Sequence, residues 1–355
     1  MKSPITLDTF LGNARTVKIL RRAIEQDRLP HAMIFAGPAG VGKCTLALVV
    51  ARYLNCLAPV GQDACGACPA CKRITAVIAS RHLVCQSLKG GYCGTCPNCR
   101  IRMGRHPDIR LVEPEKTTIS IDQIRDLINE IAFQPLEARY RVVILDPADQ
   151  MRLEAHTSLL KTLEEPPSRT VTILVTTSPY LLLDTIRSRA HLLQFGEIPR
   201  DQIERHLTAS EGRTKEEARL AAALCGGSLA AALDFNTEEY LDIREQAFHF
   251  VALLIRRGKF SEASAAAAQA TKDKRFFELW IESVAALLAD IYYARLAAER
   301  VGQRDLVARM EELGRSVSRS ELVRTIRGIE KLKSALLHNV NRQLALEAMF
   351  LETTR

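Results

Sequence analysis

The sequence predicts an α/β fold in which helices cover a parallel sheet, followed by helical domains. Three observations support this prediction. Residues 37–45 read GPAGVGKCT, between an apolar run and a helical pattern, which is the strand–loop–helix setting of a phosphate-binding loop. Short apolar runs alternate with helical patterns as far as about residue 195. From about residue 238 onward, only the apolar spacing of helices remains.

The elements of the first part follow one another along the chain. The segment SIDQIRDLINEIAF has Ser120 and Gln123 in capping-box spacing and an apolar face, which predicts a helix. The segment RVVILD at 141–146 is a continuous apolar run typical of a buried parallel strand. Helices are also expected at 14–28, from Thr45 to Leu54 and just before Pro166, and strands at Met33–Ala36, 109–112, 170–178 and 191–195.

Composition and length bound the class of protein. The chain has 355 residues, of which 47% are apolar and 25% charged, a profile typical of soluble globular proteins with two or three domains. The net charge of +8 permits a nucleic-acid partner without proving one. No apolar run reaches the ~18–20 residues of a membrane helix, so we expect a cytoplasmic protein without a membrane partner. In that compartment the ten cysteines are thiols or metal ligands.

The phosphate-binding loop departs from its usual pattern. Its backbone N–H groups, including those of Gly37, Gly40 and Gly42, can cradle phosphate oxygens, and Lys43 supplies positive charge. Cys44 stands where Ser or Thr normally binds Mg²⁺, and sulfur is a poor ligand for that hard cation. Thr45 lies about 100° further round the helix and is not expected to substitute. The sequence therefore predicts weak binding of ATP or ADP and poor binding of Mg²⁺.

The acidic motif after the strand at 141–146 shows a similar loss. Asp146 ends this strand, where a Mg²⁺-associated carboxylate belongs, although an ordinary strand-end aspartate is the alternative interpretation. ATPases of this build place a glutamate next, whereas this chain has Pro147, which has no acid–base chemistry. Asp149 is near but lies beyond a Pro-Ala turn. Hydrolysis by this chain is therefore not expected.

Two cysteine-rich stretches within residues 56–99 match each other in spacing and in their intervening residues, which indicates an internal duplication. Each set of four thiolates is enough for one closed tetrahedral Zn²⁺ site, and iron–sulfur ligation is the competing interpretation. The first set is Cys56, Cys65, Cys68 and Cys71, and the second is Cys85, Cys93, Cys96 and Cys99.

The segments LPHAMIFAGPAGVGK, SLLKTLEEPP and TIRSRA, together with the cysteine insertion, resemble the bacterial DNA polymerase III clamp-loader subunits. The resemblance implies an AAA+ domain at 1–198, a helical lid at 199–236 and a helical collar that mediates oligomerisation at 237–355. Within the family, three departures favour the delta-prime class over the gamma/tau motor class: Cys44, Pro147 and Ala231, where the motor pattern has a basic lid residue.

The resemblance also implies one catalytic role. TIRSRA is similar to the family's Ser-Arg-Cys motif, whose arginine reaches the ATP bound by a neighbouring subunit, and Arg189 matches that arginine. Without the resemblance, Arg187 and Arg189 would be interpreted as solvated charges. Ala190 replaces the cysteine of the motif.

The resemblance further implies the partners: motor and delta subunits in a hetero-pentamer, the sliding clamp and the backbone of primed DNA. Two alternatives stay open at this stage. One is an active motor-type ATPase in which Thr45 and Asp149 compensate for the lost groups. The other is a zinc-dependent nucleic-acid-binding module carried on an AAA+ scaffold.

Overall fold

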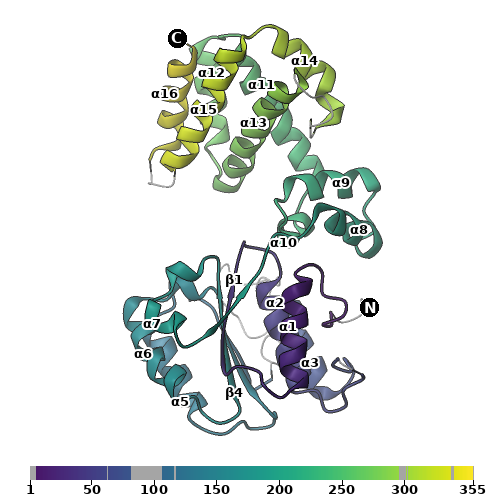
Figure 1. Cartoon of the computed structure of the whole chain (residues 1–355). Coiled ribbons are helices and arrows are strands. Elements are labelled where there is room, and N and C mark those ends of the chain that lie inside the picture. Colours follow the sequence, from purple (N-terminus) through teal and green to yellow (C-terminus); the bar gives the residue numbers. More distant parts are fainter. Residues whose placement is uncertain are drawn as a thin grey trace, which may run out of the picture. The chain divides into compact units, whose positions relative to one another are not determined.

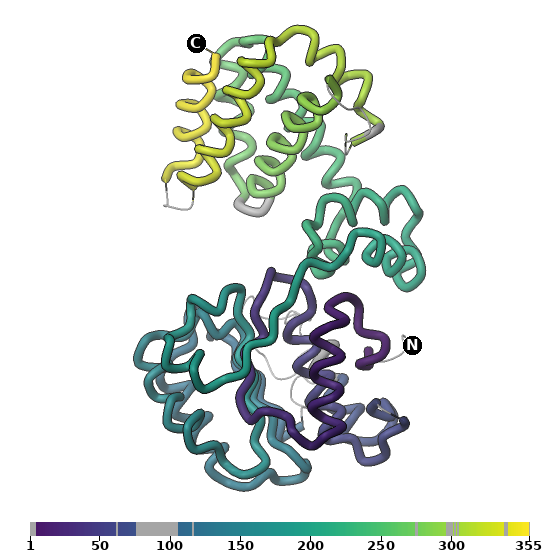
Figure 2. Tube along the Cα trace, viewed as in Figure 1, coloured from purple at the N-terminus to yellow at the C-terminus, as the bar shows by residue number. Residues whose placement is uncertain are grey.

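The structure is a computed structural model that describes residues 5–61, 63–80, 106–115, 117–295, 301, 303–336 and 340–354. The chain divides into two compact units, Met1–Asp234 and Phe235–Arg355. Figures 1 and 2 follow the chain through both. Each unit has its own core and is described by itself below.

The first unit is built on a five-stranded sheet in which every strand pair is parallel. The strand order is β2-β3-β4-β1-β5. The strands are β1 (Ala32–Ala36), β2 (Ile109–Val112), β3 (Arg141–Leu145), β4 (Thr170–Thr176) and β5 (His191–Gln194). The parallel sheet and the helices around it confirm the predicted α/β fold class.

Helices cover both faces of this sheet (Figure 1). One face carries α1 (Ala14–Glu25), α2 (Lys43–Leu54) and α3 (Pro69–Ser80), and the other carries α5 (Ile121–Ile131), α6 (Leu153–Glu164) and α7 (Asp184–Arg187). All residues of β1, β3 and β4 are buried, as the continuous apolar runs predict for strands covered on two sides. On the α5–α6 face, Ile34, Val143 and Leu174 share one core with Ile124 and Leu159.

Local sequence signals explain where several helices begin and end. Ser120 caps α5 by accepting a hydrogen bond from the Gln123 N–H, and the Gln123 side chain accepts one from the Ser120 N–H, which confirms the predicted capping box. Helix α1 ends at Glu25 rather than at residue 28, because the chain turns at Asp27, whose φ is +51°. Helix α2 begins two residues before the predicted Thr45, directly after the loop glycine at 42.

Three short helices complete the first unit: α8 (Arg200–Ser210), α9 (Lys215–Leu224) and α10 (Leu229–Leu233). Ile203 and Leu207 of α8 and Ala218 and Ala221 of α9 are buried. Thr214 and Glu217 form a second capping box at the start of α9.

The described residues of the second unit form helices only. They are α11 (Thr237–Ile255), α12 (Phe260–Ala270), α13 (Lys274–Ala294), η4 (Arg304–Leu306), α14 (Val307–Arg315), α15 (Arg319–Leu336) and α16 (Arg342–Thr354). Their core is centred on Phe250 and Trp280, whose ring centroids lie 4.9 Å apart. Among the described residues, no helix is long and apolar enough to cross a bilayer.

A buried ion pair holds one edge of the sheet. Asp108, fully buried just before β2, accepts hydrogen bonds from the backbone N–H groups of Leu136, Glu137 and Ala138 and lies 3.1 Å from a guanidinium nitrogen of Arg141. Burial acts to raise the pKa of Asp108, but these hydrogen bonds together hold that pKa below its usual value. The pair therefore fastens the loop between α5 and β3 to the sheet.

We expect Asp108→Ala to lower the free energy of unfolding of the first unit by about 3–5 kcal/mol, because Arg141 is left buried without its counter-charge. Hydrogen exchange of the β3 amides measures this directly. Glu130→Ala is the control, since Glu130 pairs with Arg110 at the surface and a pair of that kind contributes less than about 1 kcal/mol.

The same network predicts a dependence on pH. The lowered pKa means that the contribution of Asp108 is complete above the ordinary aspartate pKa of about 3.9 and is lost as the pH falls through the folded-state value. The stabilising role of Asp108 would be contradicted if, at neutral pH, the β3 amides were equally protected from hydrogen exchange in the Asp108→Ala and Glu130→Ala chains.

Candidate functional site

The carboxyl ends of three neighbouring strands bring the predicted nucleotide-binding residues together. The loop that begins at Gly37 follows β1, Asp146 follows β3, and Thr177 follows β4. Asp149 lies in the short helix η1 (Ala148–Gln150), and its carboxylate accepts a hydrogen bond of 3.3 Å from the Thr177 N–H. Because β4 lies between β1 and β3, the loop and both acidic residues share one edge of the sheet.

Lys43 lies inside the phosphate-binding loop. Its ammonium group donates hydrogen bonds to the carbonyl oxygens of Gly37 and Pro38, each at 2.6 Å, and only 6% of the residue is exposed. Burial lowers the pKa of the Lys43 ammonium, while the charges of Asp146 and Asp149 act in the opposite direction. A phosphate group would have to draw Lys43 away from these two carbonyls.

The start of α10 closes over the same loop. The Ala230 N–H donates a hydrogen bond of 3.1 Å to the Gly40 carbonyl. Gly40 has a φ of +75°, and a Cβ built there would lie 1.9 Å from the Ser228 hydroxyl oxygen, so only glycine fits. Ala231, also in α10, brings no charge to this contact.

The groups that would act on a bound nucleotide are incomplete. Cys44 is buried at the start of α2 and offers sulfur in place of a hydroxyl group. Thr45, the next residue, is partly exposed, as is Asp146 at the end of β3. Pro147 precedes η1 and offers no titratable group. The site fits phosphate through Gly42, Lys43 and the loop backbone but lacks the usual hard ligand for Mg²⁺.

The first set of cysteines forms a compact cluster. The sulfur atoms of Cys56, Cys65, Cys68 and Cys71 all lie within 4.8 Å of one another, and those of Cys65 and Cys71 are 3.9 Å apart. A tetrahedral site with Zn–S bonds of ~2.3 Å separates its sulfur atoms by about 3.8 Å. The cluster can therefore hold a metal ion such as Zn²⁺.

Backbone groups already favour thiolates in this cluster. The N–H groups of Cys65, Cys68 and Cys71 donate to the sulfur atoms of Cys56, Cys65 and Cys68 at 3.2, 3.3 and 3.5 Å. Hydrogen bonds from the backbone at Cys68 and Ala67 lower the pKa of Cys65 to about 6. Burial raises the pKa of Cys71, because its thiolate is disfavoured away from water. A bound cation would stabilise that thiolate and keep the sulfur deprotonated. The second predicted set, Cys85, Cys93, Cys96 and Cys99, lies outside the described residues.

Arg189 lies just beyond α7. Its Nε donates to a carboxylate oxygen of Glu164 at 2.8 Å, and its Nη1 donates to the Thr185 carbonyl at 2.8 Å. The side chain keeps 35% of its surface exposed. Arg187, two residues earlier, pairs instead with Asp184 and stacks over the Tyr180 ring. The two arginines of TIRSRA therefore have different partners.

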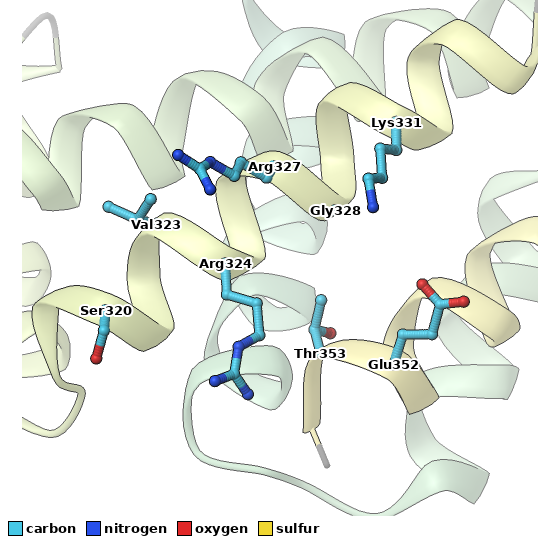
Figure 3. A pocket seen from close by; sticks show the side chains of 8 residues that line it. All are labelled: Ser320, Val323, Arg324, Arg327, Gly328, Lys331, Glu352 and Thr353. Atoms are coloured by element: carbon cyan, nitrogen blue, oxygen red, sulfur yellow. The ribbon is translucent and has the colours of Figure 1, made fainter.

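The second unit carries a basic groove of about 440 Å³ between α15 and the end of α16. Figure 3 shows that Arg324 and Lys331 lie on the side of α15 that faces Thr353, whereas the Arg327 side chain extends away from Thr353. A Cβ at Gly328 would lie 2.9 Å from the Thr353 methyl group, so this glycine allows the two helices to approach closely. The groove is lined by Ser320, Val323, Arg324, Arg327, Gly328, Lys331, Glu352 and Thr353.

The three cations of this groove have no carboxylate partner in the part of the chain that the structure describes, in contrast to several other basic residues of the second unit. Lys333 on the same helix pairs with Glu282, and Arg256 and Arg309 pair with acidic residues on other helices of the unit. No ion pair between described residues includes Arg324, Arg327 or Lys331. The groove therefore carries three cations and one carboxylate, that of Glu352, so its net charge is positive.

Comparison with known proteins identifies the family. The family described as "DNA polymerase III, delta subunit" matches residues 12–80 and 75–199. The chain belongs to this family.

Individual relatives agree with the family. The chain is 28% identical over 340 residues to DNA polymerase III subunit delta-prime of Bacillus subtilis, covering 95% of this chain and 94% of the relative. It is also 28% identical over 330 residues to delta-prime of Pseudomonas aeruginosa, covering 91% of each. The B. subtilis tau subunit is 28% identical over 250 residues, which cover 70% of this chain and 38% of tau. This member of the family is thus also related to tau, but over a smaller share of that protein.

Sequence reasoning missed several residues that the structure brings to these sites. Glu164 holds Arg189, and Ser228 and Ala230 contact the phosphate-binding loop. Arg52 is fully buried near the cysteine cluster. Glu164, Ser228 and Ala230 are distant in sequence from the residues they contact, and no local sequence pattern indicates these contacts. Arg52, by contrast, is a charged residue in a run of buried residues, four positions before Cys56.

We expect Cys68→Ser to remove the zinc bound by the first set of cysteines, because a tetrahedral structural site needs all four thiolates. Elemental analysis of the purified chain measures the loss as one metal ion per chain. Cys225→Ser is the control, since Cys225 lies after α9 and its thiol donates to the Ala222 carbonyl. Equal zinc contents in the two variants would contradict the assignment of this cluster as a zinc site.

Proposed function

We propose that this chain is a delta-prime-type subunit of a DNA polymerase III clamp loader, a largely non-hydrolysing AAA+ protein that supplies Arg189 to the ATP site of a neighbouring motor subunit. The observation that carries the proposal is the combination of an incomplete hydrolytic site with an exposed arginine in the family's finger position. The family match and the two delta-prime relatives support it.

The nucleotide site supports the non-hydrolysing part of the proposal. Cys44 and Pro147 replace the two groups that would bind Mg²⁺ and activate water, and Lys43 is hydrogen-bonded to the carbonyls of its own loop. Residues of α10 lie directly against this loop. We infer that ATP or ADP binds weakly and is not turned over.

Arg189 supports the part that concerns a neighbouring subunit. A guanidinium supplied from another protein stabilises charge on the transferred phosphoryl group and accelerates transfer by ~10³–10⁵ in GTPases. Arg189 lies at the surface and forms an ion pair with Glu164. The Arg189 side chain is 35% exposed and the Glu164 side chain is 48% exposed. Ion pairs this exposed are weak, so release of Arg189 toward an incoming phosphate costs little.

The partners follow from this role. We propose that motor (gamma/tau) and delta subunits join this chain in a hetero-pentamer in the cytoplasm. The lid at 199–236 and the collar at 237–355 keep their predicted roles in this proposal, with the collar as the oligomerising part. The assembly would then place the sliding clamp on primed DNA. The cysteine sets would bind two Zn²⁺ ions that stabilise the insertion at 56–99.

The basic groove gives the proposed DNA contact a location. Arg324 and Arg327 each carry a planar guanidinium that matches phosphate geometry, and Lys331 adds a third cation within two helical turns. We propose that the groove binds the phosphate backbone of primed DNA. Such contacts are independent of base sequence and release counterions, so they weaken as salt rises.

We expect Arg189→Ala to leave assembly intact and to slow ATP turnover at the neighbouring site by about 10³-fold or more, because that site loses its trans arginine. DNA-stimulated ATPase activity of the reconstituted loader measures turnover, and native mass spectrometry measures assembly. Arg187→Ala is the matched control, since Arg187 has the same charge but pairs with Asp184.

Unchanged turnover with Arg189→Ala would remove the role that we assign to this residue. Robust phosphate release by the isolated chain, abolished by Lys43→Ala, would establish the motor-type alternative instead. Both measurements use the full chain.

For the groove, we expect the combined change Arg324→Gln, Arg327→Gln and Lys331→Gln to weaken binding of primed DNA by the loader. The slope of log affinity against log salt should also become shallower, by ~0.7–0.9 for each lost phosphate contact. Fluorescence anisotropy at several salt concentrations measures both quantities.

The chain offers a control of equal charge in Lys333→Gln, Arg256→Gln and Arg309→Gln, whose side chains pair with Glu282, Glu312 and Glu245. An equal loss of affinity in the two triple variants would mean that net charge, rather than the groove, attracts DNA.

A further inference from the structure

We propose that Arg52 is the counter-charge of the cysteine cluster, so that its buried guanidinium balances the negative charge of the metal-loaded thiolates. This inference rests on the proposal that Cys56, Cys65, Cys68 and Cys71 bind Zn²⁺. It assigns Arg52 the role of a positioning residue that favours the metal-loaded form of the site.

The burial of Arg52 is the first observation. The residue lies in α2 with none of its surface exposed, among residues that are mostly apolar. Its Nη1 donates to the Thr75 hydroxyl at 3.1 Å, and its Nη2 donates to the Ile5 carbonyl. Its Nε is buried and has no hydrogen-bond partner among the described residues. Both acceptors are neutral, so hydrogen bonding alone does not compensate the charge.

The second observation is the lack of a paired carboxylate. No ion pair between described residues includes Arg52. The buried carboxylate in the neighbourhood belongs to Asp63, which accepts hydrogen bonds from the backbone N–H groups of Ala64 and Asp8. An isolated charge inside a protein is costly and is normally found beside an opposite charge or a metal centre.

The third observation is the position of the cluster. Cys56 follows Arg52 by four residues, and Cys71 precedes Thr75, the partner of Arg52, by one turn of α3. Burial lowers the pKa of Arg52, whereas negative charge at Cys71, Asp63, Cys56 and Cys65 raises it, in that order of size. The guanidinium therefore interacts electrostatically with the cluster as well as with Asp63.

The charge of the cluster depends on the metal. Without metal, the cluster carries only the charge of those thiols that have ionised, and the pKa of about 6 makes Cys65 the first to do so. Four thiolates around one Zn²⁺ carry a net charge of −2. Metal binding thus gives Arg52 a larger and permanent counter-charge. By thermodynamic linkage, a buried cation that is stabilised by the loaded cluster must in turn tighten metal binding. Because Arg52 also holds Ile5 and Thr75, the loaded cluster would fasten the N-terminal segment and α3 to α2.

A purely structural role is the competing explanation, in which Arg52 only holds Ile5 and Thr75. Two variants separate these roles. Arg52→Met keeps much of the volume and removes the charge, whereas Arg52→Lys keeps the charge and loses the forked geometry. A counter-charge role predicts that the Met variant loses zinc affinity by about 10–100-fold, the usual effect of changing a residue that supports metal ligands, and that the Lys variant stays within a few-fold of the parent.

The experiment uses the full chain with Cys85, Cys93, Cys96 and Cys99 changed to Ser, so that any bound zinc belongs to the first set. Competition with the chromophoric chelator 4-(2-pyridylazo)resorcinol gives the zinc affinity, and thermal unfolding with added zinc or with EDTA gives the stability of each form. Arg73→Met is the matched control, because Arg73 lies two residues after Cys71 but pairs with the exposed Glu137.

The outcomes distinguish this inference from the proposal on which it rests. If the parent chain binds no zinc, the metal-site proposal fails and Arg52 loses its assigned role with it. If the parent binds zinc and Arg52→Met binds it equally well, the metal site stands and the inference is overturned. If Arg52→Met does not fold, the Lys variant decides, because a loss of tenfold or more despite the retained charge would overturn the counter-charge role.

Discussion

The parallel pairing of β1 with β4 on one side and with β5 on the other is the constraint on which the candidate nucleotide site depends. This pairing sets the carboxyl ends of β1 and β4 beside each other, so the loop after Ala36 lies next to Thr177 and Asp149. The hydrogen bond from the Phe195 N–H to the Ala36 carbonyl extends the β5 pairing to the start of that loop. A shift in strand register would separate groups that come from three distant parts of the sequence.

Helix α2 links this edge to the cysteine cluster. It begins at Lys43, inside the phosphate-binding loop, and ends at Leu54, two residues before Cys56, so it spans about 18 Å between the two sites. Its residues from Leu46 to Arg52 are fully buried, and its side chains pack against the sheet and α3. Because packed interiors resist small displacements, the cluster and the loop hold the two ends of one rigid element. The cluster is thus well placed to stabilise the first unit.

Much of this architecture could be predicted from local sequence patterns. Continuous apolar runs identify β3 and β4, the Ser120–Gln123 spacing identifies the start of α5, and the spacing of Cys65, Cys68 and Cys71 indicates a compact cluster, which the structure contains. Each of these signals lies within a dozen residues of chain. The contacts of Lys43 with its own loop carbonyls could not be predicted in the same way, because they depend on side-chain conformation rather than on spacing.

Long-range contacts account for the rest. The approach of Ser228 to Gly40 joins residues nearly 190 positions apart, and the pairing of Glu164 with Arg189 depends on how α6 packs beside α7. Nothing in the sequence LEEPP distinguishes Glu164, which pairs with Arg189, from the glutamate that follows it. Arg52 shows the opposite case, because a charged residue directly after six apolar residues of a helix is a signal that is visible before the fold is known.

The ion pair between Glu164 and Arg189 has a consequence for selectivity. One carboxylate already neutralises this guanidinium, so a second carboxylate on a neighbouring protein would gain little by taking its place. A polyphosphate carries several negative charges, and two of its oxygens can accept parallel hydrogen bonds from one guanidinium, so it competes better for the same cation. Exchange of the resident glutamate for a polyphosphate is thereby favoured over its exchange for another carboxylate.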